Sequence, residues 1–216
     1  MDFSVPVTED IGLIFPTPVL LRQIPDYGPV NDGLKAQILA AKEKDEGVHI
    51  SNRGGWQSSP DLWDWGTPEI ETFKGWVHGC ILRMAALPAQ EGDLSKVDVE
   101  YVAGSWANVN TRGAYNDGHV HPDCDWACVY YAECGTLDPG WDRNGQFELH
   151  DPRTMAQSCK LAAYGFDRSL LIDPEPGKMI LFPAWMKHSV HPFYGDGQRI
   201  SIAVNIKITG GEHSGR

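Results

Sequence analysis

The chain has 216 residues, of which 42% are hydrophobic and 22% charged, a composition typical of a globular protein with enough length for one sizeable core. Its 18 Lys and Arg residues against 29 Asp and Glu give a formal net charge of −11, which disfavours nucleic acid and anionic lipid as partners. The sequence has no apolar run of membrane-spanning length and its first residues lack the features of a signal peptide, so we expect a cytoplasmic protein.

Two helices are predicted in the first half of the chain. Asn31 or Asp32 can cap the first helix, which is then expected to end in a charged run. Thr67 is a suitable N-cap for the second helix, because Pro68 fits a first helical turn and apolar residues follow at helical spacing as far as Leu87. Helices of this length can cover one face of a sheet.

The second half of the chain contains short runs rich in Val, Ile, Tyr, Phe and Trp, separated by turn residues. These runs cover residues 97–109, 126–132, 146–150, 178–182 and 199–208. They show no alternation of strands with helices, so we expect an antiparallel sandwich or barrel with the helices packed outside.

The five cysteines are odd in number and form no Cys-x-x-Cys pair. Neither a disulfide framework nor a zinc ribbon is therefore indicated, and we expect reduced, mostly buried thiols. The cysteines are Cys80, Cys124, Cys128, Cys134 and Cys159. For the oligomeric state, a homodimer is only the base-rate expectation.

Three histidines are candidate metal ligands. In an extended chain His119 and His121 project from the same face, so both imidazoles can reach one metal. Imidazole suits iron, zinc, copper or nickel, but such a pair alone more often consists of ordinary surface or core histidines. His188 follows the predicted strand 178–182 and supplies a possible third ligand.

Arg199 is the candidate partner for an anion near these histidines. If the strands around His188 and Arg199 form an antiparallel hairpin that reverses near Phe193, the two residues face each other with Cα atoms about 5 Å apart. A forked cation at that distance fits a dicarboxylate that chelates the metal at its other end, and Ser201 can add a hydroxyl. The alternative is an ordinary strand arginine paired with a surface acid.

In this order and at these spacings, the residues resemble the 2-oxoglutarate and Fe(II)-dependent oxygenases related to prolyl 4-hydroxylases. Residues 108–110, 113, 116, 119–122, 129–131, 151–153, 177–185, 188 and 199–201 carry the similarity, together with residues 14–18 and 47–58 nearer the amino terminus. The resemblance implies a mainly β fold with flanking helices, the double-stranded β-helix or cupin-like jelly roll. One domain, 1–216, is then expected, with a helical and irregular support region at 1–95 packed on a β-helix core at 96–210.

The resemblance also implies a ligand set. The superfamily's metal motif is His-x-Asp followed much later by His, which maps onto His119 and His188. His121 stands where the carboxylate normally lies, so either a third imidazole takes that position or Asp123 or Asp125 reaches the metal instead. We favour His121, because its spacing from His119 needs no rearrangement of the loop.

The co-substrate arginine of the superfamily corresponds to Arg199, with Ser201 beside it. Tyr131 resembles a tyrosine that supports the same carboxylate, but Tyr130 is adjacent and only one of the two can face inward. The implied function is that of a dioxygenase with Fe(II) and the co-substrate 2-oxoglutarate, which releases succinate and CO2 and hydroxylates an unidentified small-molecule or peptide substrate.

Three other interpretations are open at this point. A cupin-like site holding zinc or another divalent ion for hydrolysis or isomerisation explains the histidines but gives Arg199 no role. A structural zinc site could be built from His119, His121, Cys124 and Cys128. A non-catalytic binding jelly roll would leave the histidines incidental.

Some neighbouring residues have a structural interpretation as well as a functional one. Trp106 is expected to pack in the barrel, given the area that it can bury, and Asn108 and Asn110 are candidates for the pocket mouth or for satisfying turns.

Overall fold

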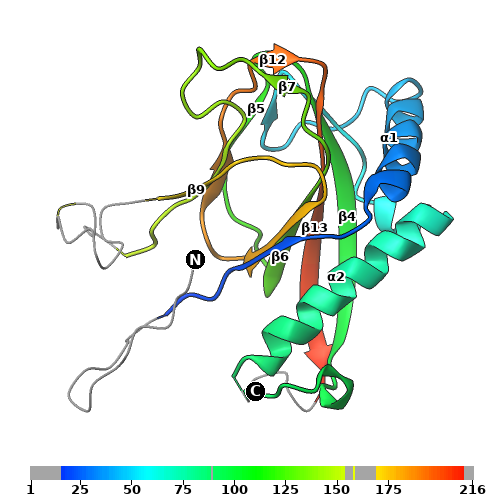
Figure 1. Cartoon of the computed structure of the whole chain (residues 1–216), viewed down its shortest axis with the longest axis vertical. Coiled ribbons are helices and arrows are strands. Elements are labelled where there is room, and N and C mark those ends of the chain that lie inside the picture. Colours follow the sequence, from blue (N-terminus) through cyan, green and yellow to red (C-terminus); the bar gives the residue numbers. More distant parts are fainter. Residues whose placement is uncertain (1–15, 89, 154–157, 159–168, 212–216) are drawn as a thin grey trace.

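The computed structural model describes residues 16–88, 90–153, 158 and 169–211 (Figure 1). A six-stranded sheet has the order β1-β10-β6-β13-β4-β3, a five-stranded sheet has the order β2-β5-β11-β8-β9, and β12 pairs with β7. Strands that follow one another in the chain, such as β10 and β11, lie in different sheets, as they do in a jelly roll. This architecture confirms the predicted mainly β fold with flanking helices.

The six-stranded sheet consists of β1 (Leu20–Gln23), β3 (Trp56–Gln57), β4 (Glu100–Asn110), β6 (Trp126–Glu133), β10 (Lys178–Pro183) and β13 (Arg199–Gly210). The five-stranded sheet consists of β2 (Asn52–Arg53), β5 (Tyr115–His119), β8 (Phe147–Leu149), β9 (Leu170–Ile172) and β11 (His188–Val190). The remaining elements are β7 (Thr136–Leu137), β12 (Gly195–Asp196), α1 (Gly28–Lys42), α2 (Pro68–Ala86) and the 3-10 turns η1 (Leu62–Asp64) and η2 (Leu94–Lys96).

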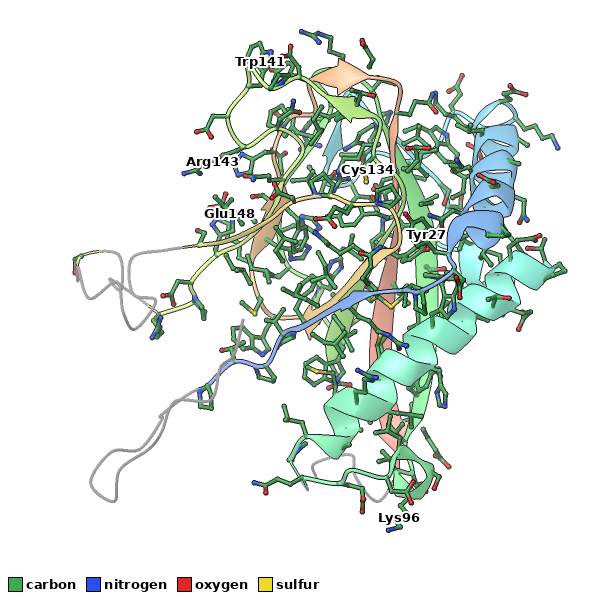
Figure 2. All side chains as sticks on the ribbon, in the orientation of Figure 1. Tyr27, Lys96, Cys134, Trp141, Arg143 and Glu148 are labelled. Atoms are coloured by element: carbon green, nitrogen blue, oxygen red, sulfur yellow. The ribbon has the colours of Figure 1, made fainter. Side chains whose placement is uncertain are left out.

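Two apolar layers hold the fold together. Alternate residues of β13, from Ile200 to Ile208, face outward and pack with both helices, which cover the same side of the large sheet (Figure 1). A second cluster, including Tyr131, Phe147 and Phe182, fills the space between the two sheets, where side chains crowd together in Figure 2. The inward face of β13 therefore looks into this inner layer.

The start and end of α2 were predicted correctly. Thr67 lies in an extended conformation and its hydroxyl accepts a hydrogen bond from the Ile70 backbone N–H at 3.4 Å, while Pro68 occupies the first turn. The helix ends at Ala86.

The predicted start of α1 was wrong. The helix begins at Gly28 with a proline in its first turn, and its N-cap residue, Tyr27, makes no side-chain cap. Asn31 is buried inside the helix, where it donates to the Ala132 carbonyl at 3.0 Å and accepts from the Tyr130 hydroxyl at 2.5 Å. Asn31, whose residue type suggested a helix cap, therefore links α1 to β6 through two hydrogen bonds.

We expect Thr67→Ala to lower the free energy of unfolding by about 1 kcal/mol, because the first turn of α2 loses its side-chain acceptor. Urea denaturation measures this change. Thr72→Ala is the matched control, since Thr72 is exposed on the same helix and bonds only back to Pro68 at 2.9 Å. Equal losses in both variants would contradict the capping role.

The predicted hairpin between His188 and Arg199 was also wrong. β11 pairs with β5 and β8 in the small sheet, whereas β13 pairs with β4 and β6 in the large one. The turn residues at Gly195 and Asp196 instead form β12, which pairs with β7. His188 and Arg199 therefore approach the same interior from different sheets rather than as cross-strand neighbours.

The amino-terminal region contributes strands to both sheets (Figure 1): β1 and β3 belong to the six-stranded sheet and β2 to the five-stranded sheet. Residues 14 and 15 of the amino-terminal similarity, and Cys159, lie outside the described residues. The four described cysteines are free thiols, as predicted, and three of them are buried. In the part of the chain that is described, neither helix combines the length and apolar character that crossing a membrane requires.

Candidate metal centre and co-substrate pocket

The three predicted histidines converge on one point. His119 ends β5, His188 opens β11, and the two residues are cross-strand partners in the small sheet. His121 lies two residues past His119, where its backbone N–H bonds the Ala184 carbonyl at 3.0 Å. One nitrogen from each of the three rings lies within 4.8 Å of the other two, so the rings can share one ion.

Backbone carbonyls orient two of the imidazoles. His119 Nδ1 lies 2.7 Å from the Asp117 carbonyl oxygen, and His188 Nδ1 lies 2.9 Å from that of Met186. With Nδ1–H donating to these carbonyls, the lone pair of each ring is on Nε2, which faces the shared point. A metal-binding histidine is commonly fixed in this way by a hydrogen bond on its other nitrogen.

Burial keeps the three imidazoles neutral. Burial lowers the pKa of His119, and burial together with the neighbouring His119 lowers the pKa of His121 to about 4. For His188 the same two causes, burial first, lower the pKa to about 3. Neutral imidazole is the form that binds metal, so no proton has to leave the site near neutral pH.

The geometry of the site fits a metal ion. His121 Nε2 and His188 Nε2 are 3.2 Å apart. Two ligand nitrogens about 2.1 Å from one ion are separated by about 3.0 Å at octahedral angles and about 3.4 Å at tetrahedral angles. Three nitrogen donors do not fill the coordination sphere of such an ion, so further positions are left for small molecules.

Neither alternative ligand set is assembled. Within the described residues the cluster of metal-binding side chains contains the three histidines and no carboxylate or thiol. Asp125 instead accepts the Ile208 backbone N–H at 2.7 Å, and Asp123 is exposed. Cys128 is buried in the outer layer against the helices, and burial raises the pKa of its thiol, so the structural zinc site is not formed.

Arg199 lies fully buried on the inward face of β13, with 1% of its surface exposed. Its guanidinium donates to the Gly145 carbonyl at 3.2 Å, to the Ser201 hydroxyl at 3.3 Å and to the Tyr131 hydroxyl at 3.3 Å. Among the ion pairs of the described residues, none involves Arg199. A buried cation without a carboxylate partner is costly unless an anion binds beside it.

The structure distinguishes the two adjacent tyrosines. Tyr131 faces the inner layer, with its ring 4.9 Å from the Arg199 guanidinium carbon, and burial raises the pKa of its phenol. Tyr130 points to the opposite face, where it packs on Phe73 and bonds Asn31. The neutral hydroxyl of Tyr131 is therefore the one that can donate to an anion held by Arg199.

We expect Tyr131→Phe to raise the 2-oxoglutarate concentration needed for half-saturation about tenfold, because one donor to the carboxylate is lost. Tyr130→Phe should leave that affinity unchanged but lower the free energy of unfolding by about 1 to 3 kcal/mol, since Asn31 loses a buried partner. Calorimetric titration of Mn(II)-loaded protein and urea denaturation measure the two effects. The assignment fails if both variants weaken 2-oxoglutarate binding equally.

Two polar residues and one aromatic residue of β4 and β13 complete the interior. Asn108 and Asn205 each have a buried side-chain oxygen without a hydrogen-bond partner among the described residues. The Trp106 ring lies 5.7 Å from the His121 ring, so this tryptophan borders the metal site and does more than pack the barrel. Sequence reasoning missed Asn205, although its even spacing from Arg199 and Ser201 along one strand places it on their face.

A family model matches the part of the chain that holds the candidate site. Residues 104–205, from the middle of β4 to late β13, match the model of the family described as "Putative 2OG-Fe(II) oxygenase". This segment contains the three histidines, Arg199, Ser201 and Tyr131. Over this segment the chain is similar to the 2-oxoglutarate and Fe(II)-dependent oxygenases. No curated protein matches the sequence of this chain.

Solved structures show that the chain has the double-stranded β-helix fold. A prolyl 4-hydroxylase from Pseudomonas putida matches with a TM-score of 0.60 and 12% identity, over 90% of this chain and 94% of that one. A prolyl hydroxylase from Trichoplax adhaerens, in complex with a hypoxia inducible factor peptide fragment, matches with a TM-score of 0.57 and 16% identity, over 88% and 83%. HygX from Streptomyces hygroscopicus, with nickel and 2-oxoglutarate bound, matches with a TM-score of 0.54 and 12% identity, over 88% and 83%.

Proposed function

We propose that this protein holds Fe(II) with His119, His121 and His188, and holds the distal carboxylate of 2-oxoglutarate with Arg199. Ser201 and Tyr131 support that carboxylate through their hydroxyls. The observation that carries this assignment is the buried Arg199 guanidinium, which opens onto the same interior as three converging imidazoles yet has no acidic partner among the described side chains. A hydrolytic cupin-like site would give that buried charge no role.

The two sheets contribute different parts of the proposed site. The small sheet and the loop after β5 present the imidazoles in their neutral form, and the Asp117 and Met186 carbonyls fix two of the rings. The large sheet presents a fork of N–H donors that matches a carboxylate in shape and charge. A co-substrate that is bound at both ends has little conformational freedom, so its 2-oxo acid end is held in a fixed orientation toward the metal.

Aromatic packing limits water around the centre. Phe182 and Phe147 lie 4.8 and 5.4 Å from the His188 ring, measured between centroids, and His188 is 2% exposed. Bound Fe(II) and 2-oxoglutarate supply the redox chemistry, in which O2 gives one oxygen atom to a substrate C–H bond and the other to succinate while CO2 leaves. The chain's own contribution is orientation, a dry interior and electrostatics.

The substrate is either a peptide or a small molecule. The Trichoplax relative of similar fold is in complex with a peptide fragment, whereas SnoK, which also has a similar fold, is a carbocyclase from nogalamycin biosynthesis, so both kinds of substrate are compatible with this architecture. A cytoplasmic location, in line with the free thiols, and a homodimer stay predictions, as does the division into a support region at 1–95 and a core at 96–210.

The proposed function is tested by titrating 2-oxoglutarate into the protein loaded with Mn(II) and by measuring succinate release after loading with Fe(II). We expect metal-dependent binding, and succinate formation that stops when iron is chelated. Pyruvate is the matched control ligand, because it keeps the 2-oxo acid but lacks the distal carboxylate and should bind far more weakly. Failure of the metal-loaded protein to bind 2-oxoglutarate would contradict the proposal.

A further inference from the structure

The inward faces of β4 and β13 form a ladder of paired positions. Side chains alternate along each strand, and the residues of β13 from Ile200 to Ile208 that point outward pack on the helices. The inward rungs are the pairs Arg199 and Asn110, Ser201 and Asn108, Ala203 and Trp106, Asn205 and Gly104, and Lys207 and Val102. The ladder thus runs from the buried co-substrate pocket to Val102, which is 58% exposed.

Asn205 lies beyond the reach of the co-substrate. Six residues of strand separate it from Arg199, roughly 20 Å at about 3.3 Å per residue, which is much longer than a five-carbon diacid. Two rungs lie between them, and the one next to Asn205 carries Trp106, whose ring borders His121 of the metal site. Asn205 is therefore one rung past the metal, on the side where the ladder becomes exposed.

Among the described residues, the side-chain oxygen of Asn205 has no hydrogen-bond partner. The register neighbours of Asn205 are Gly104 on β4 and Ala127 on β6, neither of which has a polar side chain. Its oxygen is buried and unbonded among the described residues, while the residue as a whole stays partly accessible. A buried amide without hydrogen bonds is unfavourable, and rotation about its last side-chain bond lets it offer either the oxygen or the N–H group.

The chemistry of these rungs selects a class of ligand. An asparagine amide both accepts and donates, so its complement is another group that does both, of which a secondary amide is the simplest. The indole face of Trp106 and the exposed Val102 offer apolar contact on either side of it. The Trp106 rung carries no charge, and the Val102 rung carries only the exposed Lys207, whose ammonium group can stay hydrated.

We propose that Asn205 is a specificity-determining residue that hydrogen-bonds a peptide-like secondary amide of the prime substrate, whose apolar part lies on Trp106. This inference rests on the proposed function, because it needs the metal beside Trp106. It makes the substrate an amide-containing molecule with a C–H bond held at the histidine cluster.

The test uses the full chain loaded with Mn(II) and 2-oxoglutarate, with N-acetyl-leucine N-methylamide as the probe. Paramagnetic broadening of the probe's proton signals reports binding close to the metal. We expect broadening with the wild-type protein and at least about tenfold weaker binding with Asn205→Leu. An ester with the same carbon skeleton but no N–H groups should bind equally weakly to both.

Controls keep the proposal separable from the assignment of the metal site. Thr209→Ala, on the same strand four residues further out and exposed, should bind the probe as the wild type does. Asn205→Asp keeps the side chain's size and guards against a folding defect, and it too should weaken binding of the neutral amide. Unchanged probe binding in both Asn205 variants, or no probe binding to a wild-type protein that binds Mn(II) and 2-oxoglutarate, overturns the role of Asn205. Loss of Mn(II) or 2-oxoglutarate binding itself would instead contradict the proposed function.

Discussion

Replacement of His188 by alanine is expected to abolish iron retention, with metal affinity falling by more than about 100-fold, the upper range for loss of a residue that only supports a ligand. His188 is the most buried of the three histidines and its Nε2 faces that of His121 at 3.2 Å. Without it, two imidazoles at the edge of β5 have to hold the ion alone. Metal analysis after dialysis, with Fe(II) added under nitrogen, measures the loss.

Controls for this variant separate metal loss from misfolding. His188→Leu fills the space beside Phe147 and Phe182, so its fold should survive while its iron does not. His78→Ala removes a histidine that stacks on Tyr101 outside the metal site and should leave iron unchanged. Iron occupancy equal to wild type in His188→Leu would refute the ligand assignment.

His121 is the unusual member of the set, because the superfamily normally has a carboxylate there. His121→Asp restores the usual pattern and is expected to keep iron, since a carboxylate oxygen is a good ligand for Fe(II). His121→Ala is expected to lose iron. Full retention in His121→Ala would mean that Asp123 or Asp125 moves in.

Replacement of Arg199 by glutamine is expected to raise the 2-oxoglutarate requirement about 100-fold while iron is retained. Loss of one partner from a buried, hydrogen-bonded charge pair costs about 2 to 5 kcal/mol, and about 2.7 kcal/mol corresponds to that factor. The iron remains because its ligands come from β5 and β11, not from β13. Calorimetric titration of Mn(II)-loaded protein with 2-oxoglutarate measures the change.

Arg199→Gln should affect the stability of the ligand-free protein and that of the 2-oxoglutarate complex differently. Removal of a buried charge that has no acidic partner should not destabilise the ligand-free fold, while the stabilisation by 2-oxoglutarate, about 2.7 kcal/mol at 100 times the dissociation constant, should disappear. Arg83→Gln on the exposed side of α2 is the control and should behave as wild type. Equal 2-oxoglutarate affinity in Arg199→Gln and wild type would exclude the carboxylate contact.

The parts of the fold with strong local signals were predictable. Thr67 followed by Pro68 determines where α2 starts, and the apolar runs of β4, β6, β10 and β13 identify the strands of the large sheet. β6 and β10 are buried on both faces and almost continuously apolar, whereas apolar residues of β13 alternate with polar ones. The short strands β5 and β11 carry polar or metal-binding residues such as Asn116 and His188, so hydrophobicity gave no sign of them.

The relation between His188 and Arg199 could not be derived from turn chemistry. Gly195 and Asp196 mark a reversal, but a reversal is equally compatible with a hairpin and with a crossing to the other sheet. The crossing buries the apolar faces of both sheets, which is a global effect. The inward direction of Tyr131 likewise follows from the pairing of β6 between β10 and β13, because either tyrosine alone satisfies the strand pattern.

In the proposed site, three imidazoles and no carboxylate bind one iron ion beside Arg199. X-ray absorption spectroscopy of the Fe(II) and 2-oxoglutarate complex, together with anomalous diffraction at the iron edge, tests it most directly. We expect a single iron bound to one nitrogen each of His119, His121 and His188, with the diacid extending from it to Arg199. An iron bound by Asp123 or Asp125, or a metal located elsewhere in the chain, would contradict it.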